Sequence, residues 1–173
     1  MDKIRLRALT ISDIDKTLEW NNQELISDRY SGHPFPVNLE IEKRLYEKVL
    51  TSNFPTTVFG IELRDKKKLI GLTMLKEIDM ITRSAKFGIM IGDPETRGKG
   101  YAHEACLKAL EFGFRKLGLH RIYLKVHKTN TAALKLYEKC GFRMEGTLRD
   151  SDFKNGIFID ELIMSVLSGE FNG

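Results

Sequence analysis

Residues 95–105 read ETRGKGYAHEA, and this stretch decides the fold because a glycine-rich loop here joins a strand to a long amphipathic helix. The strand is predicted over residues 82–91 and ends at Gly92-Asp93-Pro94. The helix is predicted over residues 100–117, where apolar residues recur every three or four positions, and Gly118 ends it. Because the first-turn amides of a helix are free donors at the positive end of its dipole, the loop is a candidate phosphate site.

Two common phosphate-binding patterns do not match this loop. It lacks the G-x-x-x-x-G-K-[ST] spacing of nucleoside-triphosphate loops. Gly98-Lys99-Gly100 begins the dinucleotide pattern, but His103 stands where a glycine or alanine is required. No acidic residue ends a second strand about 20 residues further on. Both of these site classes are therefore excluded.

Length and composition indicate one domain over residues 1–173. Hydrophobic residues make up 42% and charged residues 30%, which is ordinary for a globular protein. No apolar run approaches the ~20 residues needed to span a bilayer, and the N-terminus lacks a signal-peptide core, so we expect a cytoplasmic protein without a membrane partner. The net charge is +4, but the charges are interspersed, so we expect no nucleic-acid partner. Cys106 and Cys140 are expected to be small buried hydrophobes.

Strands and helices are predicted in the order β-α-α-β-β-β-α-β-α-β-β, without repeats. Consecutive strands without helices between them exclude a purely doubly wound sheet. The sequence therefore predicts an α/β (α+β) fold with a mixed, mostly antiparallel central sheet flanked by helices. Strands are expected at residues 4–9, 56–63, 68–78, 82–91, 121–127, 142–148 and 156–167, and helices at 12–21, 38–50, 100–117 and 130–140.

Two segments together resemble the GNAT N-acetyltransferase superfamily. Residues 97–102, RGKGYA, fit the acetyl-CoA motif R/Q-x-x-G-x-G/A. One strand later, residues 130–142, NTAALKLYEKCGF, are similar to the second signature of that superfamily. The resemblance covers about residues 4–167. The opening LRALTISDID, the WNN at residues 20–22 and the EGTLR at 145–149 look most like the Rim-type and spermidine acetyltransferase branch.

The resemblance implies a GNAT-like fold and an acetyl-CoA-dependent N-acetyltransferase. Acetyl-CoA would be the co-substrate, and a primary amine would attack it directly, without an acetyl-enzyme. The acceptor would be a protein N-terminus or a small-molecule amine. Two alternatives stay open: a spermidine or other polyamine acceptor, and a CoA-binding module without turnover. No metal is expected, and the hairpin around residues 150–160 could pair between chains in a homodimer.

The expected coenzyme contacts follow from the two motifs. Gly98 and Gly100 lack β-carbons, so the backbone could curl around a pyrophosphate, with Arg97 and Lys99 adding charge. Asn130 could cap its helix or reach the pantetheine, and Gly88 is a candidate bulge or bend in the strand that would splay beside it. By resemblance, the expected acetyl-CoA contacts are Met90, Ile91, Arg97, Gly98, Lys99, Gly100, Tyr101, Ala102, His103, Asn130 and Ala133.

Tyr137 is the expected general acid. By resemblance its phenol would donate a proton to the departing thiolate, although a tyrosine on an apolar helix face could equally fill the core. Glu77 is the first candidate for the general base that the ammonium nucleophile needs. The further candidates for this base are Glu24, Asp28, His33 and His127, and Trp20, Tyr30 and Phe35 could line the acceptor pocket or fill core.

One feature of the sequence argues against a polycationic acceptor. At residues 31–34, SGHP, and at residues 85–87, AKF, a glycine, a histidine and a lysine stand where spermidine acetyltransferases tend to carry carboxylates. An unpaired lysine near a polycation repels it.

Overall fold

The computed structural model describes residues 2–23, 36–51 and 54–171. Its centre is a seven-stranded sheet in the order β1-β2-β3-β4-β5-β7-β6. The β4–β5 pair is parallel and the other pairs are antiparallel. The sheet confirms the predicted mixed, mostly antiparallel class. The strands are β1 (Ile4–Arg7), β2 (Thr57–Leu63), β3 (Leu69–Asp79), β4 (Ser84–Ile91), β5 (Arg121–His127), β6 (Arg143–Lys154) and β7 (Ile157–Leu167).

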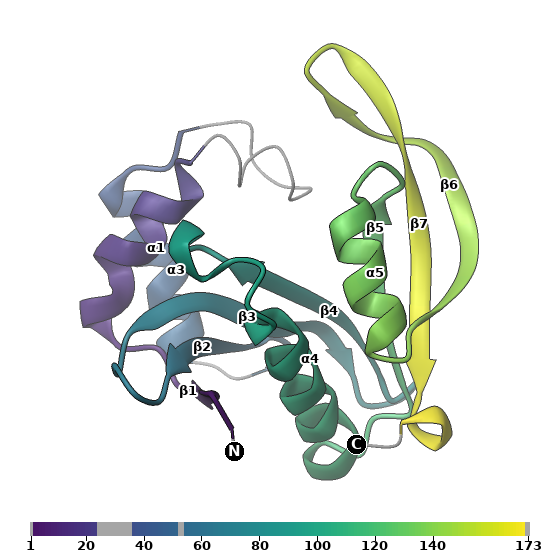
Figure 1. Ribbon diagram of the computed structural model, residues 1–173, viewed down its shortest axis with the longest axis horizontal. Coiled ribbons are helices and arrows are strands. Elements are labelled where there is room, and N and C mark those ends of the chain that lie inside the picture. Colours follow the sequence, from purple (N-terminus) through teal and green to yellow (C-terminus); the bar gives the residue numbers. More distant parts are fainter. Residues whose placement is uncertain (1, 24–35, 52–53, 172–173) are drawn as a thin grey trace.

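Helices cover both faces of the sheet (Figure 1). On one face lie α1 (Ile14–Asn21) and α3 (Leu39–Thr51), and on the other lie α4 (Tyr101–Glu111) and α5 (Thr131–Lys139). Successive side chains of β4 point to opposite faces of the sheet, so this strand contributes residues to both hydrophobic cores. Phe87 and Ile89 join the larger core under α4 and α5, whereas Met90 joins the smaller core with Trp20 and Tyr46.

The parallel strands β4 and β5 are paired over only part of their length. Their ladder joins Ser84 to Arg121, Ala85 to Ile122 and Lys86 to Tyr123. Beyond Lys86 the two strands separate, and Figure 1 shows β5 and α5 diverging from β4. This confirms the splayed strand expected before the glycine-rich loop. From Phe87 to Ile91, the edge of β4 toward β5 is therefore open.

The splay does not depend on a bulge at Gly88, which was predicted there. Gly88 pairs regularly with Met74 of β3, and the irregularity of the β3–β4 ladder lies between Lys76 and Asp79. At that bulge Glu77 has a φ of 52°. The expected bulge at Gly88 is therefore wrong, because the β3–β4 ladder is regular there and shifts its register only nearer the β3–β4 turn.

Several element boundaries differ from the prediction, and three of them are instructive. The first strand ends at Arg7, because the chain then turns to bury Leu9 against α1. The helix predicted to residue 117 is α-helical only to Glu111 and continues as a π-helical turn over Phe112–Lys116. β6 runs six residues past its predicted end at 148, because bulges at Leu148–Asp152 let it resume pairing up to the Asn155-Gly156 turn.

Candidate active site

The glycine-rich loop leaves a run of backbone donors without partners. Gly98 and Gly100 have φ values of 74° and 84°, and a β-carbon added to either would meet no protein atom within 4 Å. Within the described part of the chain, the amides from Gly98 to Ala102 donate to no other group. The His103 amide is already used, because it donates to the Gly100 carbonyl at 3.1 Å. Five consecutive amides at the N-terminus of α4 thus form a cradle suited to an anion.

Arg97 has a different place from the one expected. Its guanidinium turns back onto the end of β4, where it donates to the carbonyls of Ile91 at 3.2 Å and Gly92 at 3.0 Å. A third contact, at 3.5 Å, reaches the Gln23 side chain. Arg97 therefore fixes the loop to β4 and α1, while Lys99 is exposed in the loop.

Of the two residues expected at the open edge of β4, only Ile91 presents its backbone groups there, because the Met90 carbonyl points toward Gly71 of β3. Met90 pairs with Leu72 and Ile91 with Gly71 on the β3 side. In such a strand every second amide and carbonyl points away from its antiparallel partner, here into the gap toward β5. The Met90 side chain is buried, at 6% exposure, in the core beside Trp20. The strand thus presents backbone polar groups to the gap, and its side chains anchor it to both cores.

Helix α5 forms the wall of the gap opposite α4. Asn130 acts as its N-cap, since its Oδ1 accepts from the Ala133 amide at 3.2 Å. The structure thus favours the capping role over a contact with pantetheine. Tyr137 is 8% exposed and lies edge-on to Phe87 and Phe142, with ring centroids 6.2 and 5.7 Å away. Tyr137 therefore lies beside the point where β4 leaves β5.

Glu77 lies at the closed end of the gap. Its Oε2 accepts from the Tyr123 hydroxyl at 2.9 Å, and its Oε1 lies 3.7 Å from the Lys86 ammonium. Burial, and then Glu77, raise the pKa of Tyr123. Lys76 faces Lys86 directly across the β3–β4 ladder. Desolvation, and then Lys86, lower the pKa of Lys76. One carboxylate therefore shares this end with two lysines.

The other residues expected near the acceptor have separate outcomes. Glu24, Asp28, His33, Tyr30 and Phe35 lie outside the described residues. Trp20 fills core, at 2% exposure. His127 ends β5 and is 6% exposed, and its Nε2 lies 2.6 Å from Oδ2 of Asp152 on β6.

Sequence reasoning missed the partners of His127. Asp152 lay between the strands predicted at residues 142–148 and 156–167, and it belongs to β6, which resumes its pairing after a register shift. Glu161 of β7 lies directly opposite His127, is 5% exposed, and accepts from the Ser151 hydroxyl at 3.0 Å. No short-range pattern could have found this group, because it comes from three strands joined only by the sheet register.

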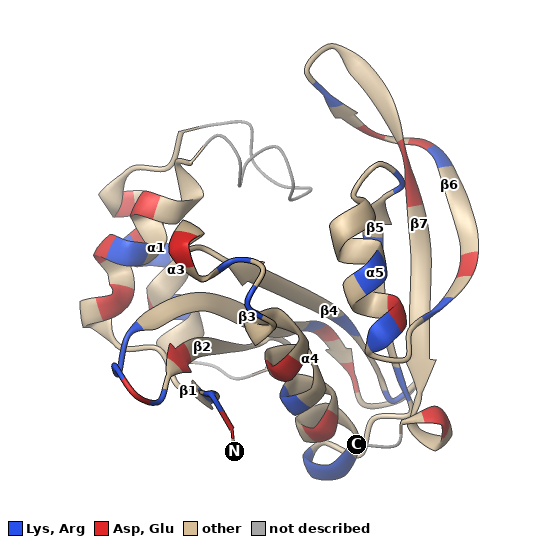
Figure 2. Ribbon diagram, viewed as in Figure 1, with Lys and Arg blue, Asp and Glu red and all other residues tan. Residues whose placement is uncertain are grey.

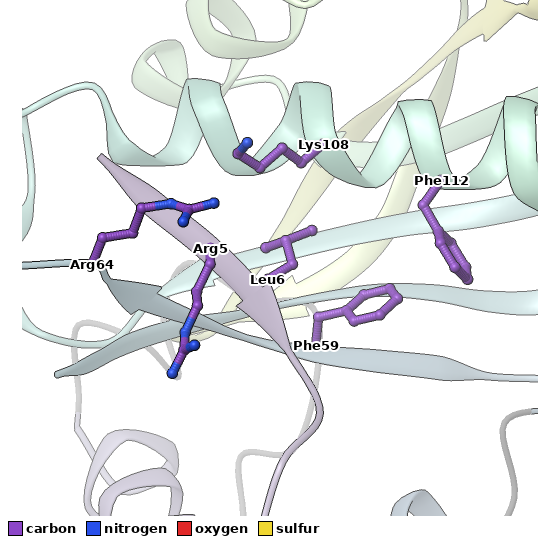
Figure 3. Close-up of a pocket in the computed structure, with 6 residues that line it drawn as sticks. All are labelled: Arg5, Leu6, Phe59, Arg64, Lys108 and Phe112. Carbon is purple, nitrogen blue, oxygen red and sulfur yellow. The ribbon is translucent and has the colours of Figure 1, made fainter. Parts of the chain in front are cut away.

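A different hollow, of about 300 Å³, lies between β1, β2 and α4 (Figure 3). Its cations are already matched by acids: Arg5 contacts Glu62 at 2.7 Å, and Lys108 contacts Asp2 at 2.7 Å. It is lined by Arg5, Leu6, Phe59, Arg64, Lys108 and Phe112. This hollow shares none of these residues with the gap between β4 and β5. Among the described residues, no helix has the length and apolarity to cross a membrane, and no group of three potential ligands is placed to hold a metal.

Comparison with known proteins gives one consistent result. The model of a family described as an acetyltransferase (GNAT) domain matches residues 3–143. The spermidine N(1)-acetyltransferase of Vibrio cholerae is 38% identical over 169 residues, which cover 98% of this chain and 95% of that protein. A crystal structure of the Vibrio cholerae spermidine N-acetyltransferase with CoA and spermine matches with a TM-score of 0.92 and 36% identity, covering 99% of each chain. A dodecameric structure of that enzyme matches with a TM-score of 0.82 and 37% identity, over 96% of this chain and 95% of that one.

Proposed function

The chain belongs to the GNAT acetyltransferase family, and on that premise we propose that its amine acceptor is a polyamine of the spermidine type. It uses acetyl-CoA as co-substrate and transfers the acetyl group to an amine. The observation that carries the polyamine proposal is the similarity, over nearly the whole of both chains, to an enzyme crystallised with CoA and spermine. Polyamines and acetyl-CoA are both used in the cytoplasm, and the two free, buried cysteines suit such a reducing compartment.

The loop and the open strand fit acetyl-CoA. Five free amides from Gly98 to Ala102 suit the pyrophosphate, because no β-carbon at Gly98 or Gly100 obstructs them. The open edge of β4 at Ile91 suits the amides of the pantetheine arm, with Met90 beside it. When bound, acetyl-CoA supplies an acetyl group activated as a thioester. A backbone amide of this edge would stabilise the carbonyl oxygen as it gains negative charge. The remaining proposed contacts, Tyr101, His103 and Ala133, line the first turns of α4 and α5.

Tyr137 is the proposed general acid. It lies on α5 beside the start of the gap and is held by two aromatic neighbours, Phe87 and Phe142. A phenol is protonated at neutral pH and can donate to a leaving thiolate. Burial, and then Cys140, raise the pKa of the Cys106 thiol, so this thiol is a poor nucleophile. Both points support direct transfer without an acetyl-enzyme.

Glu77 suits binding of the acceptor ammonium. It is exposed at the closed end of the gap, and its two oxygens already engage Tyr123 and Lys86. The lysine pair at this end favours a second candidate acceptor, a small amine of lower charge. Lys86 and Lys76 would repel one end of a long polycation, which a monoamine avoids.

An acceptor panel distinguishes these candidates. We would measure CoA release, as kcat/KM, for spermidine, a monoamine, an amino sugar and a short peptide with a free N-terminus. The proposal predicts the highest kcat/KM for spermidine. A higher value for the monoamine or the peptide would overturn the polyamine proposal while leaving the acetyltransferase family intact. Lys86→Glu is the matched variant, and its kcat/KM for spermidine should rise several-fold if Lys86 repels the acceptor.

Two further proposals concern assembly and domain organisation. All described strands belong to one sheet, which supports a single acetyltransferase domain over residues 1–173. The β6–β7 hairpin exposes Phe153 and Phe158, whose tilted rings are in contact with centroids 5.0 Å apart. An exposed aromatic pair on a projecting hairpin suits contact with a second copy of the chain. Light scattering after size exclusion tests this, and a monomer at all concentrations would contradict it.

A further inference from the structure

We propose that His127 is the proton acceptor for the attacking amine, oriented by Asp152. This inference rests on the proposed function, since it concerns the same gap between β4 and β5. It assigns to a buried pair a role that Glu77 was expected to perform.

The register of the sheet places His127 at the gap. Each β5 residue in the β4–β5 ladder is 37 positions after its β4 partner, as in Ser84 with Arg121 and Lys86 with Tyr123. The same offset, carried along the separated strands, sets His127 opposite Met90. A pantetheine arm between two strands needs roughly twice the 4.8 Å strand spacing. His127 and the open edge of β4 would therefore be the two sides of the space that the thioester enters.

The alternation of β5 fixes the face on which the imidazole lies. Leu124 and Val126 join the core under α4 and α5, so His127 points to the opposite face. Tyr137 belongs to the α5 side. The acid and the proton acceptor thus flank the gap from opposite faces. This arrangement suits direct attack, because the amine proton and the leaving sulfur of the tetrahedral intermediate can each reach a separate protein group.

Asp152 selects the nitrogen that is free to accept a proton. Its Oδ2 lies 2.6 Å from Nε2 of His127, and an ionised carboxylate only accepts, so Nε2 carries the hydrogen. Nδ1 of the neutral ring then has the lone pair. The burial of His127 holds the ring in this one orientation. The pairing gives the imidazole the tautomer that a base requires.

Charged groups face His127 from three strands. Asp152 faces it from β6, Glu161 faces it from β7, and Lys125 lies on the same face of β5 itself. Lys128, just beyond the strand, lies 3.7 Å from Asp160. Figure 2 shows the acidic segment of β7 along this part of the sheet. Two carboxylates beside the imidazole attract an arriving ammonium.

The proton balance of the step is complete. The ammonium gives one proton to Nδ1 of His127, and the free amine forms a C–N bond with the carbonyl carbon. The C–S bond then breaks, and Tyr137 protonates the leaving sulfur. The second proton of the attacking nitrogen restores the tyrosine hydroxyl through solvent. His127 releases its proton to solvent, so the net reaction frees one proton for each acetyl group transferred.

His127→Gln is the decisive variant. Glutamine keeps an N–H that can bond to Asp152 but cannot take up a proton at neutral pH. We expect kcat to fall about 100-fold or more, the usual range for a lost general base. His120→Gln is the matched control, because His120 is exposed, bonds Ser168 at 3.2 Å and lies before the other end of β5.

Two further measurements test the role of His127 separately from the integrity of the fold and of the coenzyme site. Acetyl-CoA should stabilise His127→Gln against heat as much as the wild type, which shows that the fold and the cradle are intact. In NMR of the CoA-saturated protein, spermidine should shift the His127 imidazole signals and leave those of His120 unchanged.

An unchanged kcat in His127→Gln would overturn the inference, as would an equal fall of kcat in the control His120→Gln. A wild type that transfers no acetyl group to any amine would overturn the proposed function itself.

Discussion

Replacing Gly100 by alanine tests whether the loop at the start of α4 holds the pyrophosphate. Gly100 has a φ of 84° and Gly118, at the far end of the same helical segment, has a φ of 66°. An added β-carbon meets no protein atom within 4 Å at either position. Both alanine substitutions therefore introduce the same left-handed backbone strain, which lowers the free energy of unfolding by about 1–2 kcal/mol. For a chain of this size that corresponds to a Tm lower by roughly 2–8 °C.

Only Gly100 lies in the cradle, so only its variant should lose affinity for acetyl-CoA. A methyl group there obstructs at least one hydrogen bond between an amide and a charged phosphate oxygen, which is worth about 1.5–3 kcal/mol. The Kd for acetyl-CoA should rise about 10- to 100-fold in Gly100→Ala.

Calorimetric titration gives the Kd of each variant, and thermal unfolding gives the strain. Gly118→Ala should match Gly100→Ala in Tm and the wild type in Kd. Equal affinities in the two variants would refute the assignment of the cradle, because the shared strain would then be the whole effect.

Three further outcomes are expected. Tyr137→Phe should lower kcat about 100-fold or more while leaving the thermal shift by acetyl-CoA at its wild-type value, and an unchanged kcat in steady-state assays would remove Tyr137 as the acid. Arg97→Met should raise the Kd for acetyl-CoA, because the loop loses its bonds to the Ile91 and Gly92 carbonyls, and titration with acetyl-CoA checks this. Burial raises the pKa of Asp13, but hydrogen bonds from Arg7 and Thr10 outweigh burial, so the pKa of Asp13 is lowered in the folded protein. The ionised Asp13 therefore stabilises the fold above the pKa that it has in the unfolded chain, and this stabilisation is lost as the pH falls below about 4. Urea unfolding at several pH values should show this loss in the wild type and a weaker one in Arg7→Met.

Much of the fold could be predicted from the sequence, because the patterns that indicate it involve residues close together in the chain. The alternation of residues 121–127, the Asn130 cap and the Asn155-Gly156 turn each depend on neighbours along the chain. The two motifs likewise predicted the loop at Gly98–Ala102 and the tyrosine at position 137. The predicted ends of helices and strands were wrong where tertiary packing sets them, as in the π-helical turn at Phe112–Lys116.

The site was predicted less completely, because part of it depends on register. Arg97 was expected to add charge beside the pyrophosphate, but its guanidinium instead donates to a carbonyl at the end of β4. The partners of Glu77 became visible only with the β3 bulge, which turns that residue toward Lys86 and Tyr123. His127 could be named from sequence, but Asp152 and Glu161 reach it from strands whose pairing no local pattern specifies.

The central claim is direct transfer of the acetyl group from acetyl-CoA to an amine in the gap between β4 and β5. The measurement that tests it most directly is a single-turnover reaction with spermidine, following thiol release together with the intact mass of the protein. The account predicts thiol release only when the amine is present, one acetylated amine for each CoA freed, and no change in protein mass. An acetylated protein formed without the amine, or CoA binding with no thiol release, would contradict it.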